Sequence, residues 1–160
     1  MAARKHPSDR RLRRFSEEHL LYEIGMLWET AARLGSPPAD AVTRNALIES
    51  FGIHLRLVVD FLYEPARRPD DVCAEDYVAD GAKSHRARRR LPRVLRTATR
   101  HTDKQVAHLT FKRYRGSAPQ KRWTPLRLLD LVRPALRAFR EHALTRRLHP
   151  NVRQYIDERL

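Results

Sequence analysis

Residues 102–114, TDKQVAHLTFKRY, carry the side chains whose types and spacing best suit chemistry. Lys104 and His108 are four positions apart, so they share one face if this segment is helical. Cleavage of a phosphodiester by a neighbouring 2′-hydroxyl needs an imidazole that moves protons and cations that hold the phosphate. We therefore take His108 as the candidate general acid/base and Asp103 as the group that orients either His108 or the neighbouring cation. Lys104 and Arg113 are the candidate phosphate-binding cations.

A second histidine, His54, lies in the largely apolar segment NALIESFGIHLRLVVDF. A histidine beside an apolar helix face is more often a hydrogen-bonded core residue than a catalyst. His54 is therefore a secondary catalytic candidate, together with Arg56. Arg56 and Asp60 are spaced for an ordinary i,i+4 ion pair. Cys73 is the single cysteine and has no recognisable partner, and we predict neither a metal site nor a cofactor.

An arginine-rich run precedes residues 102–114 in the sequence. Eight lysines and arginines lie between Lys83 and Arg100. Four of them follow a spacing of three or four residues and would form one basic ridge on a helix: Arg89, Arg93, Arg96 and Arg100. Guanidinium groups bind phosphate in a bidentate manner and stack on bases, so the ridge is a candidate nucleic-acid-binding surface. The alternatives are a solvated helix face, or a contact with the acidic half of another copy.

The charge of the chain is unevenly distributed around its net value of +14. Residues 15–80 contain 5 basic and 13 acidic side chains, whereas residues 81–129 contain 15 basic side chains and the single acid Asp103. An acidic first half and a basic second half suit association between copies of the chain or attraction of a polyanion. Because the depletion of acids extends through Arg127, we favour a polyanion as the partner.

The elements that position these residues are all predicted to be helices. Ser16 is a good N-cap for a first helix ending at Gly35, with Phe15 and Leu20 spaced for a hydrophobic staple. Residues 40–63 form the clearest second helix, closed by Pro65. Asp70 or Asp71 is expected to cap a short helix that runs through Tyr77.

Three further helices are expected in the second half. One begins near Pro92, and the next begins at Thr102, where Thr102 and Gln105 fit a capping box. Thr124 and Pro125 begin a last long helix, which is followed by a C-terminal tail or short helix from Pro150. The inward residues are expected to be Leu91, Val94, Leu95 and Ala98 in the first of these helices, and Leu128, Leu129, Val132, Leu136, Phe139 and Ala143 in the last long one.

The predicted fold class is therefore all-α, a four- to five-helix bundle with a basic N-terminal arm. We assign residues 1–15 to a flexible basic arm, 16–148 to a single bundle domain, and 149–160 to a C-terminal tail or short helix. No apolar run reaches the roughly 18 residues of a membrane span, and no apolar segment follows the basic N-terminus as in a secretory signal. We expect a cytoplasmic protein with no membrane partner.

The segments ESFGIHLRLVVDF and DKQVAHLTFKR resemble the two central helices of the HEPN superfamily of small α-helical bundles. The resemblance covers about residues 16–143, and its specific part is DKQVAH. It implies a metal-independent ribonuclease of a toxin–antitoxin or phage-defence system, with an active site completed across a homodimer. The family's polar residue and histidine correspond to Asp103 and His108. Its arginine has no match at the usual spacing, because Thr102 is six residues before His108 and Arg100 is eight before it.

Two main functions follow from the sequence. The first is a HEPN-like RNA-binding protein, for which metal-independent RNA cleavage is a candidate activity, with Arg100, Lys104 or Arg113 supplying the positive charge. The alternative is a non-catalytic helical adaptor for nucleic acid or a partner protein. A third interpretation is purely structural, with His54 and His108 as buried polar residues and the arginine-rich run in contact with another protein. The expected partners are nucleic acid (RNA before DNA), a second copy of the chain, and an antitoxin or other protein.

Overall fold

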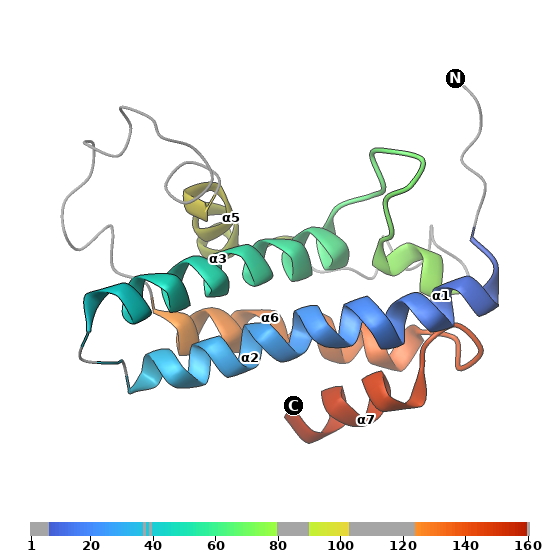
Figure 1. The fold of residues 1–160 in the computed structure, drawn as a ribbon. Coiled ribbons are helices and arrows are strands. Elements are labelled where there is room, and N and C mark those ends of the chain that lie inside the picture. Colours follow the sequence, from blue (N-terminus) through green and yellow to red (C-terminus); the bar gives the residue numbers. More distant parts are fainter. Residues whose placement is uncertain (1–6, 37, 39, 80–89, 103–123, 160) are drawn as a thin grey trace.

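The computed structural model describes residues 7–36, 38, 40–79, 90–102 and 124–159. Within these ranges the secondary structure is helical, without a strand, and the helices form the predicted all-α bundle (Figure 1). None of the helices in the described part of the chain is long and apolar enough to cross a membrane.

The N-terminal helix is continuous through three segments: α1 (Asp9–Phe15), the wider π-helical turn η1 (Ser16–Leu20) and α2 (Leu21–Gly35). Ser8 caps this helix, because its hydroxyl accepts a hydrogen bond from the backbone N–H of Arg11 at 3.3 Å. The N-cap of the helix is therefore eight residues before the predicted one, Ser16.

The prediction of Ser16 as the N-cap is wrong. Ser16 has helical backbone angles (φ −64°, ψ −37°), and its hydroxyl donates to the carbonyl of Arg13 at 2.7 Å. The same hydroxyl accepts a hydrogen bond from the backbone N–H of His149 at 3.0 Å. The last seven residues of the predicted flexible arm are thus helical, and Leu12, which is 2% exposed, anchors them to the core.

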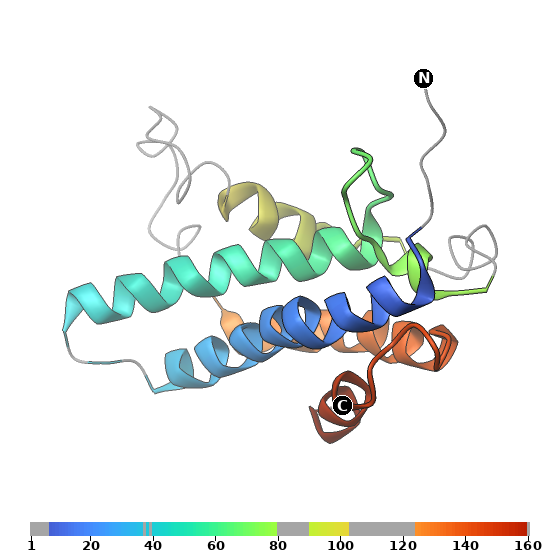
Figure 2. The same ribbon diagram turned by 45° about the vertical axis from the view of Figure 1, so that its right-hand side comes forward.

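The second long helix, α3 (Ala41–Tyr63), agrees with its predicted range. Asp40 caps it by accepting the backbone N–H of Thr43 at 2.8 Å, and it ends at Glu64, just before Pro65. Its buried face packs against α2, with which it forms the main helix pair of the bundle (Figures 1 and 2). The apolar side chains of this face are Phe51, Leu55, Val58, Val59, Phe61 and Leu62.

Two C-terminal helices complete the bundle. α6 (Pro125–His142) begins after Thr124 and buries the five helical positions that the sequence indicated, with Ala143 buried just beyond its end. The C-terminal segment is helical, α7 (Pro150–Arg159), and packs against α6, η1 and α2 through Val152 and Ile156. Arg140 of α6 pairs with Asp157 of α7 at 2.6 Å.

A polar clamp joins the two ends of the described chain. Asp9 accepts hydrogen bonds from Arg146 at 2.5 Å and from Arg147 at 2.6 Å, and the bond from Arg147 is the main cause of the lowered pKa of Asp9. Arg147 also donates to the carbonyls of Asp76 and Val78. These two arginines therefore hold the N-terminal helix to the loop that precedes α7.

The short helix after α3 is a 3-10 turn, η2 (Ala74–Tyr77), and Cys73 is its N-cap. The prediction of Asp70 or Asp71 as the cap is wrong, because the Asp71 carboxylate accepts the backbone N–H groups of Arg67 and Arg68 instead. Tyr77 is fully buried and donates its hydroxyl hydrogen to the carbonyl of Leu12 at 3.0 Å. η2 is thereby fixed to α1.

Candidate nucleic-acid interface

The helix that carries the predicted basic ridge is α5 (Arg93–His101). Its apolar face is narrow and consists of Leu95 and Ala98, which are buried. Val94, which we expected to point inward, is 45% exposed, because it lies at the edge of this short apolar stripe. α5 packs on α3 and lies on the side of α3 that faces away from α7 (Figures 1 and 2).

Thr102 fixes the C-terminal end of α5 to α3. Its hydroxyl is within hydrogen-bonding distance of the carbonyl of Gly52 (3.2 Å) and of the carbonyl of Ala98 (3.3 Å), and the residue is 2% exposed. Its backbone angles (φ −54°, ψ −49°) continue the helix. The prediction of Thr102 as the N-cap of a new helix is therefore wrong, because an N-cap residue has extended angles and a hydroxyl free to accept a backbone N–H.

Three residues of the predicted ridge lie on the outer face of α5: Arg93, Arg96 and Arg100 are all exposed. They span about 10 Å along the helix axis at 1.5 Å per residue. None of the ion pairs found among the described residues involves them. The ridge therefore presents three guanidinium groups to solvent. Arg89, the fourth predicted member, lies outside the described residues.

The proposed catalytic segment lies outside the described residues. This applies to Asp103, Lys104, His108 and Arg113. Their roles therefore stay predictions, as does the idea that they form a site with Arg100.

His54 of α3, by contrast, lies at the contact between α3 and α2. It is 8% exposed, and its Nδ1 lies 2.6 Å from Oε2 of Glu23 on α2. Tyr22 covers the ring edge-on, with ring centroids 5.6 Å apart. The carboxylate fixes the orientation of the imidazole, which is the arrangement of an orienting group in an acid–base dyad and equally of a satisfied polar residue between two helices.

His54 and the basic ridge lie on opposite flanks of α3. His54 points toward α2, whereas Gly52, whose carbonyl binds Thr102 at the end of α5, lies two positions earlier. Two positions correspond to about 200° around a helix. The described structure therefore does not bring His54 together with Arg93, Arg96 or Arg100. Nε of Arg56 lies 3.5 Å from Oδ2 of Asp60, which is the ion pair that the i,i+4 spacing predicted.

Glu23 was missed by the sequence reasoning. It is 31 residues from His54, so no local spacing indicated the pair. The one available signal was an acidic residue placed next to the buried stripe of the first helix, between Leu20 and Ile24.

Comparison of the chain with protein-family models, with curated proteins and with solved structures finds no match.

Proposed function

We propose that this protein binds RNA, and that the exposed ridge of Arg93, Arg96 and Arg100 is its main contact with the phosphate backbone. The observation that carries the proposal is that three exposed guanidinium groups lie on one face of α5, whereas several other arginines are held by carboxylates. Arg140 and Arg147, for example, form close ion pairs with Asp157 and Asp9. The ridge has no such acidic partner among the described residues, so its charge is available to a ligand.

The surrounding sequence supports a polyanionic ligand. Residues 81–129 contain 15 basic side chains and one acidic one, so the field around α5 favours phosphate. RNA is favoured over DNA because the HEPN resemblance implies an RNA partner. The same resemblance favours a homodimer and an antitoxin or other protein as further partners. The alternative function is a non-catalytic adaptor that uses the same surface.

RNA binding by this ridge should depend steeply on salt. Each neutralised phosphate of a single strand adds about −0.7 to the slope of log K against log salt concentration, so three contacts predict a slope of about −2 or steeper. Fluorescence anisotropy of a labelled 20-nucleotide RNA, titrated at several NaCl concentrations, measures this slope. A DNA of the same sequence is the control for the expected preference for RNA over DNA. A slope near zero would contradict the proposal.

A second candidate function is metal-independent RNA cleavage, favoured by the spacing of Asp103, Lys104 and His108. In this proposal His108 is the general acid/base and Asp103 orients it. Lys104, Arg100 or Arg113 holds the phosphate. Completion of the site across a homodimer is what the HEPN resemblance implies.

His108→Ala is expected to lower the rate of RNA cleavage in EDTA at least about 100-fold, the usual contribution of general acid–base catalysis. Its unfolding free energy should stay within about 1 kcal/mol of the unmodified protein. Gel analysis of a 5′-labelled RNA measures the rate, and His142→Ala, at an exposed histidine of α6, is the matched control. Equal cleavage by the His108 variant would remove this residue from the mechanism. Binding without any turnover by the unmodified protein would favour the adaptor.

A further inference from the structure

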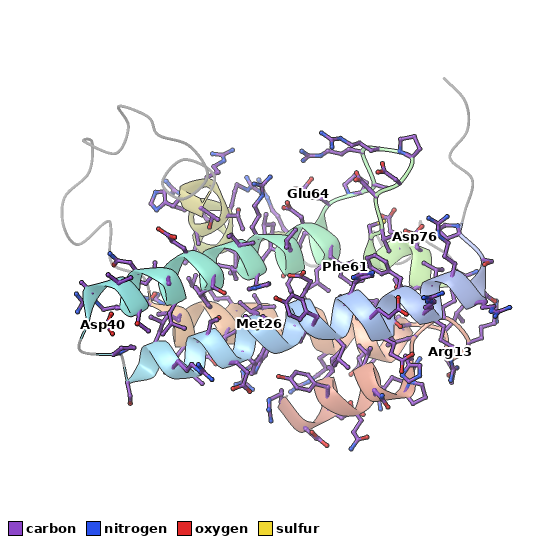
Figure 3. The ribbon with its side chains drawn as sticks, viewed as in Figure 1. Arg13, Met26, Asp40, Phe61, Glu64 and Asp76 are labelled. Carbon is purple, nitrogen blue, oxygen red and sulfur yellow. The ribbon has the colours of Figure 1, made fainter. Side chains whose placement is uncertain are left out.

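A pocket of about 480 Å³ lies where α3 ends and the following loop, residues 64–73, folds back beside it. Glu64, labelled in Figure 3, marks the point where the helix ends at this loop. The apolar part of the lining includes Phe61 and Cys73, which are buried, and Leu57, which is 45% exposed. The pocket accounts for this exposed leucine, because its side chain forms a wall. We call this site the α3-loop pocket.

The loop is held in shape by one carboxylate. Oδ2 of Asp71 accepts the backbone N–H groups of Arg67 at 2.9 Å and of Arg68 at 2.8 Å. These two bonds fix two successive arginines in the lining of the pocket. Arg67 pairs with Glu64 at 2.8 Å, whereas Arg68 is exposed and forms no ion pair with a described residue. A planar guanidinium group is therefore available to stack on a flat ligand or to bind phosphate.

Asp60 supplies a carboxylate in the wall of the same pocket. Burial raises its pKa, and the neighbouring Arg56 guanidinium opposes that shift. The ion pair between them joins Nε of Arg56 to Oδ2 of Asp60 at 3.5 Å. An ionised carboxylate has about four acceptor positions on its two oxygens. Asp60 can therefore accept two further N–H groups from a ligand.

We propose that the α3-loop pocket holds one guanine base of a bound RNA, an inference that rests on the proposed RNA-binding function. Guanine is the common RNA base that presents two adjacent N–H donors on its Watson–Crick edge, at N1 and N2, and these match the two oxygens of Asp60. Its flat face packs on Leu57, and the Arg68 guanidinium stacks on it or binds its phosphate. Unpaired bases of single-stranded RNA are read in this way, by stacking and by hydrogen bonds to their edges.

The position of the pocket agrees with the basic ridge. α5 and the loop 64–73 lie on the same side of α3, the side away from α7, in both views (Figures 1 and 2). One strand can therefore lay its phosphates on α5 and place a base in the pocket. The volume of about 480 Å³ falls within the range of roughly 300–1,000 Å³ that is typical of small-ligand sites.

Calorimetric titration of the full chain with GMP and with AMP tests the pocket separately from the ridge. GMP is expected to bind at least about tenfold more tightly, the discrimination given by one good bidentate contact. Asp60→Asn replaces an acceptor by an amide donor and should abolish the preference for GMP. Asp130→Asn, at an exposed aspartate of α6, should preserve it. Arg68→Ala should lower the affinity for both nucleotides and leave the ratio of the two dissociation constants unchanged. Because Arg68 is exposed, this variant tests the pocket without disturbing the fold.

The outcomes separate the pocket from the proposed function. Equal binding of GMP and AMP by the unmodified protein, or full discrimination by Asp60→Asn, overturns the guanine site. Salt-dependent binding of a guanine-free RNA with no binding of GMP also overturns it and leaves RNA binding intact. Specific GMP binding without RNA binding overturns the proposed function and keeps the pocket as a guanine nucleotide site.

Discussion

Replacing Arg93, Arg96 and Arg100 together by glutamate is expected to weaken RNA binding by on the order of 100-fold or more at 100 mM salt. The change removes three attractions to phosphate and puts three repulsions in their place. The salt dependence should become shallower by about 2 in log–log slope. The fold should survive, because all three positions are exposed and glutamate has nearly the helix propensity of arginine.

The matched control is a triple variant with the same loss of net charge at a different place. Arg10, Arg33 and Arg44 are exposed, belong to α1, α2 and α3, and form no ion pair with a described residue. Their replacement by glutamate should reduce RNA affinity far less than the α5 variant does. Arg146 and Arg147 would be a poor control, because both bind Asp9 and their reversal would open the clamp. Equal losses in the two triple variants would mean that net charge alone, and no defined ridge, attracts RNA.

The outer face of α5 could be predicted from the sequence because its signal is local. A repeat of three and four residues places Arg93, Arg96 and Arg100 on one side of any helix, whatever that helix packs against. The range of α3 was predictable for the same reason, from its continuous apolar stripe and from Pro65. Both inferences needed only helix geometry.

The start of the first helix could not be found from such a pattern. Between Ser8 and Phe15 the single aliphatic residue is Leu12, surrounded by arginines, so the segment has the composition of a solvated arm. Long-range contacts hold the helix there: Leu12 is buried in the core, and Asp9 is bound by Arg146 and Arg147, more than 130 residues away in sequence. A contact of that range exists only after the bundle has folded.

The same reason explains why the polar sites were missed. The contact of His54 with Glu23 depends on the register between α2 and α3, which no spacing within one helix encodes. The α3-loop pocket depends on the Asp71 carboxylate turning back to two backbone N–H groups, whereas the sequence placed this aspartate at a helix cap. His108 and its neighbours lie outside the described residues, so their chemistry stays a prediction from the motif.

The largest effect on stability is expected for Phe139→Ala. Phe139 of α6 packs edge-to-face on Phe61 of α3 and on Tyr77 of η2, with ring centroids 5.1 Å and 5.6 Å apart. Figure 3 shows Phe61 pointing from α3 into the bundle. Truncating a buried phenylalanine costs about 3–5 kcal/mol, from the lost burial and the cavity left behind. Because domains are stable by roughly 5–15 kcal/mol, the variant should lose a large part of its unfolding free energy.

Urea unfolding followed by circular dichroism measures this loss. Leu126→Ala is the control on the same helix, and it should cost about 0.5 kcal/mol or less, because Leu126 is 54% exposed. A loss below about 1 kcal/mol for Phe139→Ala would mean that the three rings do not form the junction between α3, η2 and α6. Phe61 belongs both to this junction and to the lining of the α3-loop pocket. The Phe61 side chain therefore connects the packing of α6 to the proposed guanine site. For this reason Phe139→Ala should weaken GMP binding even in the molecules that stay folded.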